Sequence, residues 1–265
     1  SEKEYLKRPE WRYICSLEKD AAEEYEKEVH FHLLCFNTGY LDFLCKQIEE
    51  VMVKYSPCGI FLDIISPKVC FCEKCLADMK EAGLDCENEE DCEKFAQITF
   101  NKYLSATNAA VRKYSDTATI FHNEGHIPKG DYRYIDSNTH LELESLPTGG
   151  WGYDHFPLSA AYTRTLKNTE FLGMTGKFHH SWGEFGGFKH PNALRYEASL
   201  SIANGAKCSI GDQLHPLGFM EDATYKLIGA AYAEVEEKEA WCDHVNAVTD
   251  IAVLGNDAVV EVIAV

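Results

Sequence analysis

The sequence has no long apolar run, no excess of positive charge and no glycine-rich phosphate motif, and each absence excludes a class of protein. No apolar stretch approaches the roughly 18 residues of a membrane span. The Lys/Glu-rich N-terminus lacks the apolar core of a signal peptide. A net charge of −18 and a pI near 5.0 disfavour nucleic acids and anionic membranes as partners, because both would repel the chain. Without a G-x-G-x-x-G loop, no organic cofactor is expected.

The composition, 45% hydrophobic and 26% charged over 265 residues, is that of a globular protein. The eleven cysteines are odd in number and unevenly spread, with three packed between Cys70 and Cys75. A disulfide framework would space them more evenly, so the pattern predicts reduced thiols in a cytoplasmic, soluble protein. We interpret the cysteines as metal ligands and buried core residues.

Short apolar segments of strand length alternate with longer segments of helical periodicity from Tyr40 onward. The predicted strands are 59–65, 117–121, 140–145, 171–175 and 208–211. The predicted helices are 40–55, 93–114, 157–166, 191–204 and 221–240. Residues 1–30 are charged and poor in apolar residues, which predicts a loop, and 248–254 and 259–265 resemble further strands.

Polar residues follow every predicted strand, and they include the acids Asp63, Glu124, Glu144, Glu184 and Asp212. Parallel α/β sheets carry their active sites at the carboxyl ends of the strands. A doubly wound sheet concentrates such residues at one switch point, so their presence after every strand favours a (β/α)8 TIM barrel. Three strands are missing before Asn37. We therefore predict strands four to eight of a barrel in residues 1–244 and the start of a second α/β domain in 245–265.

Three closely spaced cysteines, Cys70, Cys72 and Cys75, follow the first predicted strand at C-x-C-x-x-C spacing. Thiolates at this spacing can reach one tetrahedral ion, and a fourth ligand must then come from elsewhere. Cys86 and Cys92 are candidates for it. Four thiolates would leave no open position for water, which predicts a structural zinc. The alternative is a group of reduced, partly buried thiols.

The motifs Cys35-Phe-Asn-Thr-Gly-Tyr40, Gly-Ile-Phe-Leu-Asp63 and Cys70-Phe-Cys72-Glu-Lys-Cys75 resemble a segment of family 42 β-galactosidases. In that family the segment holds a structural zinc with four cysteines. The resemblance implies that Cys35 is the fourth ligand, beside Cys70, Cys72 and Cys75.

Three longer runs, 140–153, 174–187 and 206–216, are similar to hypothetical glycosyl hydrolases that include the family 151 α-L-fucosidases. The similarity extends from about Pro9 to Cys242. It implies a complete barrel followed by a β-galactosidase-type trimerisation domain, so the first three strands and most of the second domain would be absent here. A barrel open beside the Asp63 strand would expose unpaired backbone and apolar surface, which predicts a homo-oligomer.

A retaining α-L-fucosidase needs two carboxyl groups, one an ionised nucleophile and one a protonated acid. Resemblance to the family 29 α-L-fucosidases, whose nucleophile is an Asp at the end of the fourth strand, implies Asp63 in this role. Glu124 follows the next strand and is preferred as acid/base, with Glu184 and Glu144 as alternatives; Glu142 and Asp212 complete the candidates. Each acid could instead be a hydrogen-bond partner of the true catalytic group.

An oligosaccharide or glycoside substrate would need hydrogen-bonding groups and aromatic faces near these acids. We predict this role for His122, His126, Trp151, His179, His180, Trp182 and Asp212. A structural role is the alternative for any single histidine. The alternative functions are a β-galactosidase-like glycosidase, a non-catalytic carbohydrate-binding or assembly protein, and a zinc-knuckle interaction module.

Overall fold

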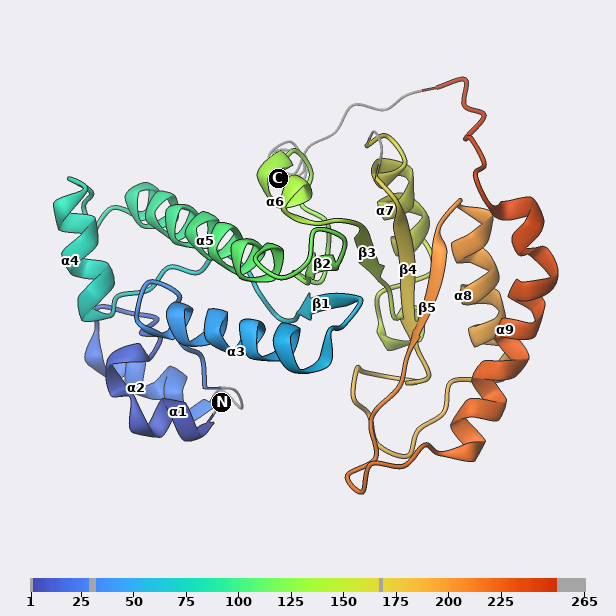
Figure 1. Cartoon of the computed structure of the whole chain (residues 1–265), viewed down its shortest axis with the longest axis horizontal. Helices are drawn as coiled ribbons and strands as arrows, with labels where there is room; N and C mark the ends of the chain where they lie inside the picture. Colours follow the sequence, from blue (N-terminus) through green and yellow to red (C-terminus); the bar gives the residue numbers. More distant parts are fainter. Residues whose placement is uncertain (1, 29–31, 167–168, 252–265) are drawn as a thin grey trace. The chain divides into compact units, whose positions relative to one another are not determined.

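The computed structural model describes residues 2–28, 32–166 and 169–251, and the chain divides into two compact units, Ser1–His122 and Asn123–Val265. Each unit is an arrangement of helices around parallel strands (Figure 1). Among the described residues, no helix combines the length and the apolar character that a membrane crossing requires.

In the first unit, two helices pack together beside a two-stranded parallel sheet. Helix α3 (Tyr40–Tyr55) precedes strand β1 (Gly59–Leu62), and helix α5 (Glu89–Arg112) precedes strand β2 (Thr119–His122). The buried core between them is built from Ile48 and Met52 of α3, Val111 of α5 and Ile120 of β2. These are apolar residues at helical spacing, and their burial holds the helices against the sheet.

The N-terminal segment is helical, which corrects the prediction of a loop over residues 1–30. It contains α1 (Glu2–Lys7), a 3₁₀ turn η1 (Pro9–Trp11) and α2 (Lys19–Glu28). The sequence of α2, Lys-Asp-Ala-Ala-Glu-Glu-Tyr-Glu-Lys-Glu, consists largely of strong helix formers. The apolar content of α2 is too low for hydrophobic periodicity to indicate a helix, whereas the helix propensity of its residues does indicate one.

Helix α5 begins four residues earlier than the predicted start at residue 93, because the acidic residues before that position form its first turn. The Asn88 side chain accepts a hydrogen bond from the Asp91 N–H (3.1 Å) and caps the helix. Glu89, Glu90 and Asp91 follow in the first turn, where negative charge is favoured by the helix dipole. The helix α4 (Glu73–Glu81), which begins within the cysteine motif and contains Cys75, was not predicted.

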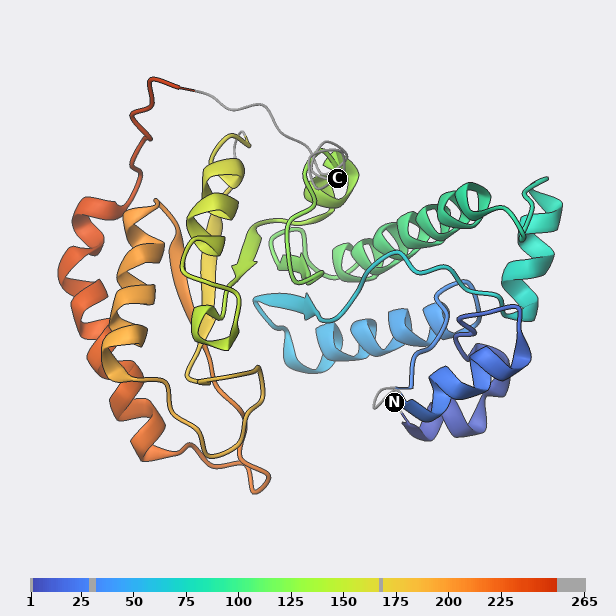
Figure 2. The same ribbon diagram turned by 180° about the vertical axis from the view of Figure 1, so that it is seen from behind.

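In the second unit, three parallel strands pair in the order β3 (Leu141–Glu144), β4 (Phe171–Gly176), β5 (Lys207–Gly211). Helix α7 (His155–Thr163) packs on β3, and α8 (Pro191–Ala203) packs on β4 and β5. The long helix α9 (Asp222–Cys242) covers α8, and both views place this pair on one side of the sheet (Figures 1 and 2). The short α6 (Tyr132–Ser137) and the 3₁₀ turn η2 (Pro147–Gly149) flank β3.

The structure confirms all five predicted strands and the α/β class, with parallel pairing in both sheets. Leu141 and Leu143 are buried, and so is Glu142, whose carboxylate is hydrogen-bonded to His140 Nε2 (2.8 Å). Residues 248–251 do not form the predicted strand. The remainder of that prediction, with 259–265, lies outside the described residues.

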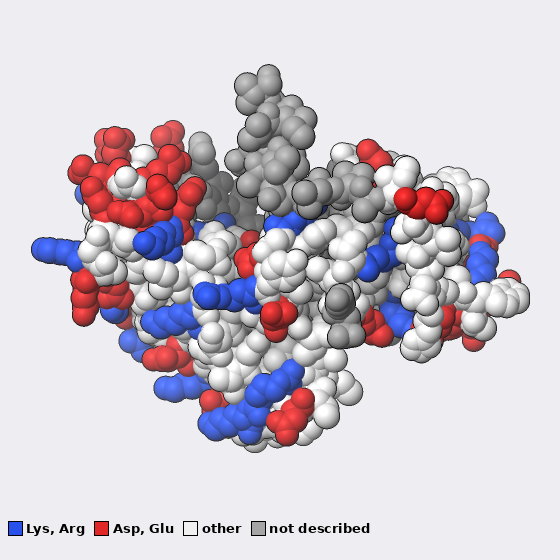
Figure 3. Space-filling model, turned by 90° about the horizontal axis from the view of Figure 1, so that it is seen from above, with Lys and Arg blue, Asp and Glu red and all other residues white. Residues whose placement is uncertain are grey.

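The surface agrees with the acidic composition. On the face seen in Figure 3, acidic side chains form one dense group, whereas Lys and Arg side chains are dispersed. This face shows no continuous basic area that would attract an anionic polymer, which agrees with the net charge of −18.

The close pairing of β1 with β2 leads to a stability prediction. A Cβ atom at Gly59 would lie 2.0 Å from Thr119 Oγ1 and 2.8 Å from the Thr119 carbonyl oxygen, so Gly59→Ala must push the strands apart. We expect a loss of about 1–3 kcal/mol in the free energy of unfolding, measured by urea denaturation.

Gly229 within α9 is the control, because nothing lies within 4 Å of its added Cβ and alanine favours a helix. Gly229→Ala should leave stability unchanged or raise it by about 0.4–1 kcal/mol. Equal effects of both substitutions would contradict the described strand pairing.

Candidate active site and metal centre

Four buried cysteines of the first unit form a compact sulfur cluster. The ligand atoms of Cys35, Cys70, Cys72 and Cys75 all lie within 4.8 Å of one another, and the Cys35 and Cys75 sulfurs are 3.5 Å apart. A tetrahedral ion with metal–sulfur bonds of about 2.3 Å would separate its sulfurs by about 3.8 Å. The group therefore has the size and the donors to hold a metal ion. Cys35 completes it, and the alternatives Cys86 and Cys92 do not belong to it.

Backbone and amide N–H groups point at the cluster. The Ile14 N–H donates to Cys70 Sγ (3.5 Å), and the Asn37 N–H donates to Cys35 Sγ (3.4 Å). The Asn37 side-chain amide reaches Cys75 Sγ (3.8 Å) and is itself held by Asp78 (2.9 Å). Such donors stabilise thiolates, and second-sphere partners of this kind orient metal ligands.

The thiols share their protons unequally. Hydrogen bonding from Cys35 lowers the pKa of Cys70 and of Cys72, whereas hydrogen bonding with Cys70 raises the pKa of Cys35. Thiolate is the form that binds metal, so the cluster already favours ionised sulfur at two positions.

Asp63 follows β1 directly and is exposed. The next residue, Ile64, has a φ angle of 53°, in the left-handed region that a β-branched residue rarely adopts. The chain therefore turns sharply after Asp63, and buried Ile65 anchors the turn.

Glu124 lies in the second unit, half-buried in the loop before α6. Burial, with the Asp131 carboxylate nearby, raises the pKa of Glu124 to about 7. A carboxyl group in this environment keeps a substantial share of its acid form at neutral pH and is able to donate a proton. Sequence reasoning missed Asp131, which also caps α6 by accepting a hydrogen bond from the Tyr134 N–H (3.0 Å).

Glu144, at the end of β3, is joined to the loop that contains Glu124. The Asn123 side-chain NH2 donates to Glu144 Oε1 (2.8 Å), and the side-chain oxygen Asn123 Oδ1 accepts from the Gly125 N–H (2.9 Å). Asn123 is buried and was also missed by sequence reasoning, although its place between His122 and Glu124 in the post-strand segment was a signal.

Glu184 has the opposite environment to Glu124. Its carboxylate accepts hydrogen bonds from the His180 N–H (2.9 Å) and the His179 N–H (3.1 Å), and His180 Nδ1 lies 3.3 Å away. The backbone and side chain of His180 lower the pKa of Glu184. An ionised carboxylate held within its own loop is poorly suited to donate a proton.

Trp182 lies against the carboxyl ends of β4 and β5. A Cβ atom on either Gly176 or Gly211, which are paired in the sheet, would come within 2.9 Å of the Trp182 ring. Buried Trp182 Nε1 and Gln213 Oε1, which follow β4 and β5, have no hydrogen-bond partner in the described part of the chain. A donor and an acceptor at these strand ends are thus available to water or a polar ligand.

The other residues predicted to bind substrate differ in exposure. His122 is fully buried, and its ring nitrogens are occupied by the Tyr103 hydroxyl (3.2 Å) and Asn108 Oδ1 (2.9 Å), the arrangement of a structural histidine. Burial lowers the pKa of His122 to about 4. The remainder lie at the surface or are half-buried: His126, Trp151, His179, His180 and Asp212.

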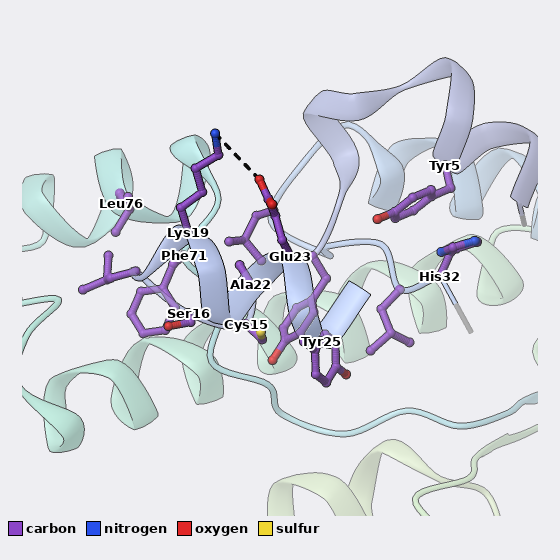
Figure 4. A pocket seen from close by; sticks show the side chains of 14 residues that line it. Tyr5, Cys15, Ser16, Lys19, Ala22, Glu23, Tyr25, His32, Phe71 and Leu76 are labelled. Carbon is purple, nitrogen blue, oxygen red and sulfur yellow. Dashed lines mark ion pairs between the residues drawn. The ribbon is translucent and has the colours of Figure 1, made fainter. Parts of the chain in front are cut away.

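A pocket of about 340 Å³ lies at the N-terminal helices of the first unit (Figure 4). Tyr5, Tyr25 and Phe71 contribute aromatic rings, and the Lys19–Glu23 ion pair (3.7 Å) stands beside it. The Tyr5 ring is already stacked on His32, with centroids 4.3 Å apart. None of the carboxylates predicted to act in catalysis lines this pocket.

No family model matches the chain, and neither does any curated protein. Among solved structures, it is similar to α-L-fucosidase isoenzyme 2 from Paenibacillus thiaminolyticus, with 48% sequence identity and a TM-score of 0.89. That match covers 96% of this chain and 38% of the fucosidase chain. A β-galactosidase from the psychrophilic Marinomonas ef1 matches with a TM-score of 0.58 at 10% identity, over 79% of this chain and 45% of that one. The first likeness confirms the resemblance to α-L-fucosidases, and the second shows a related fold alone.

The sulfur cluster predicts bound metal. We expect about one metal ion per chain in protein purified without chelator, and its loss in Cys72→Ser, because three thiolates no longer complete the tetrahedron. Elemental analysis measures both. Cys58→Ser, at an exposed cysteine outside the cluster, should keep the metal. Metal retained in full by Cys72→Ser would refute the assignment.

Proposed function

We propose that the protein is a glycoside hydrolase that acts on α-L-fucosides by a retaining mechanism with two carboxyl groups. The observation that carries this proposal is the 48% identity to an α-L-fucosidase over 96% of the chain. Since the chain spans 38% of that enzyme, assays should use the natural protein at its full length.

The five strands fit a partial (β/α)8 barrel, as strands four to eight within residues 1–244. The parallel pairing of β1 with β2 and of β3, β4 and β5, each strand followed by helix, supports this. Residues 245–265 would begin a second domain. The edge of β1 that is not paired with β2 would be covered by another copy of the chain in a homo-oligomer.

In the proposed reaction, the Asp63 carboxylate attacks the anomeric carbon of the fucoside and forms a covalent glycosyl ester. Glu124 donates its proton to the glycosidic oxygen as the aglycone leaves. The ionised Glu124 then removes a proton from water, which attacks the same carbon and releases fucose and the Asp63 carboxylate. The raised pKa of Glu124 supports its role as acid/base over Glu184, whose pKa is lowered.

Substrate would be held by groups at the strand ends. Glu144, fixed by Asn123, is placed to accept hydrogen bonds from sugar hydroxyls, and Trp182 offers an aromatic face and a free N–H. We assign the further contacts to His126, Trp151, His179, His180 and Asp212.

Zinc is the proposed ion of the sulfur cluster, bound by Cys35, Cys70, Cys72 and Cys75. Four sulfur donors suit zinc, and a complete set of thiolates leaves no position for a reacting water. When bound, it would cross-link the chain and stabilise the fold rather than take part in the reaction. Asn37 and Ile14 would orient the ligands.

The proposed function is tested with aryl α-L-fucosides and aryl β-D-galactosides. We expect hydrolysis of the fucoside, and a loss of about 10³-fold or more in turnover for Asp63→Gly, because the nucleophile is removed. Azide should restore part of the rate by occupying the vacated space. Galactoside hydrolysis would indicate the β-galactosidase-like alternative, and sugar binding without turnover would indicate a carbohydrate-binding protein. Normal turnover in Asp63→Gly would move the nucleophile to Glu144 or Glu184.

The environment of Glu124 predicts a pH dependence. Because the acid form of a group with a pKa of about 7 is lost as pH rises, kcat/KM for a poor leaving group should fall above about pH 7. Asp131→Asn keeps the helix cap but removes the charge that adds to the effect of burial on the Glu124 pKa, so this fall should begin at somewhat lower pH. Asp136→Asn, at an exposed acid of the same helix, is the control. An unmoved profile in Asp131→Asn would contradict the effect of the Asp131 charge on Glu124.

A further inference from the structure

The loop from Lys177 to Lys189 leaves and rejoins the body of the second unit at one narrow neck. The Lys189 N–H donates to the Lys177 carbonyl oxygen (2.7 Å), and the Lys177 N–H donates to the Gly211 carbonyl oxygen at the end of β5 (3.0 Å). A loop whose ends meet in this way is an Ω-loop. It carries three of the residues assigned above to the substrate, His179, His180 and Trp182, and also Glu184, whose carboxylate bonds the loop's own backbone.

Within the loop, the chain is fixed to itself. The Glu184 carboxylate bonds the N–H groups of His179 and His180, and the Trp182 ring packs edge-on against Phe178 with centroids 5.8 Å apart. The tip of the loop is therefore held in one conformation by contacts within the loop itself. Its place over the sheet depends on the neck, and Trp182 fits there only because Gly176 and Gly211 have no side chains.

A buried charged cluster lies at the neck. Lys189 is fully buried, and its ammonium forms an ion pair with Glu197 of α8 and donates to Thr175 Oγ1 of β4 (2.9 Å). The Thr175 hydroxyl donates to Glu197 Oε2 (2.5 Å), and the Tyr153 hydroxyl donates to Glu197 Oε1 (3.3 Å). One strand, one helix and two loops thus meet at a single carboxylate.

Burying two charges removes them from water, and the mutual attraction of such a pair often only offsets this cost. Apolar side chains of similar volume would serve the stability of the fold equally well. The ion pair instead adds specificity of position, because its hydrogen bonds fix the segments of backbone that carry Lys189, Thr175 and Glu197 relative to one another. We propose that Lys189 and Glu197 are positioning residues, whose buried pair sets the neck of the 177–189 loop and so places Trp182 at the substrate. This inference rests on the proposed function for its substrate, but not for the loop's order.

The test replaces the pair by apolar residues in Lys189→Met/Glu197→Leu. Each single variant leaves one buried charge unpaired and should lower the melting temperature, whereas the double variant should recover most of it. We expect the double variant to keep the fold and still show faster hydrogen exchange at the amides of 178–188, by about tenfold or more. KM should rise by about tenfold with a smaller change in kcat, because substrate contacts are misplaced.

A matched control removes a surface pair that joins the same helix, α8, to α9. Arg195 of α8 is paired with Glu234 of α9 at the surface, so Arg195→Met/Glu234→Leu should leave loop exchange and KM as in the wild type. If the buried double variant fails to fold, Thr175→Val removes the bridging hydroxyl alone and should give the same change in loop exchange at a smaller amplitude.

The proposal would be overturned if the amides of 178–188 exchanged at the wild-type rate in a folded double variant. If the double variant does not fold, a wild-type rate in Thr175→Val would overturn it. The pair would then have a purely structural role. Hydrogen exchange does not depend on turnover. Absence of fucoside hydrolysis in the wild type would therefore contradict the proposed function, whereas the exchange experiment would still test the positioning of the loop independently.

Discussion

In both sheets, neighbouring strands run parallel and in register, so that Leu62 lies opposite His122 and Gly176 lies opposite Gly211. Parallel pairing requires a long crossover between strands, which the helices supply, and it directs all strand ends of a sheet to one edge. Within each sheet, the residues that follow the strands therefore lie at the same edge, although no local sequence pattern indicates that they are close together. The candidate active site is a consequence of this one constraint.

Environment, more than residue type, separates the acidic side chains that reach these edges. Glu124 is half-buried beside a second carboxylate, and its pKa rises to about 7. Glu184 is surrounded by backbone N–H donors, and its pKa falls. Chemically identical groups thus become a candidate acid and a carboxylate that orders its own loop, which is the usual way a protein divides acid and base roles.

The two units fix their functional loops by different means. In the first, only six residues separate Asp63 from Cys70, so a metal held by the cysteines would restrain the turn that presents Asp63. In the second, a buried ion pair at Lys189 and Glu197 restrains the loop of Trp182. Both devices act beside a loop that carries candidate site residues, the first through cysteine sulfurs and the second through a buried ion pair.

The sequence by itself determined the α/β class, the five strands and most of the helices, because apolar periodicity depends only on nearest neighbours along the chain. It also identified the three cysteines of the C-x-C-x-x-C motif, since their spacing is local. It failed where local signals conflict, as in the acidic first turn of α5 and the charged helix α2. The resemblance to family 42 β-galactosidases implied Cys35 as the fourth ligand, and the structure confirms that it lies in the cluster. Only the tertiary structure decided that His122 is enclosed by Tyr103 and Asn108, and that Glu124 and Glu184 have opposite pKa shifts. Those properties depend on burial and on partners distant along the chain or set by loop geometry, which no pattern of neighbouring residues encodes.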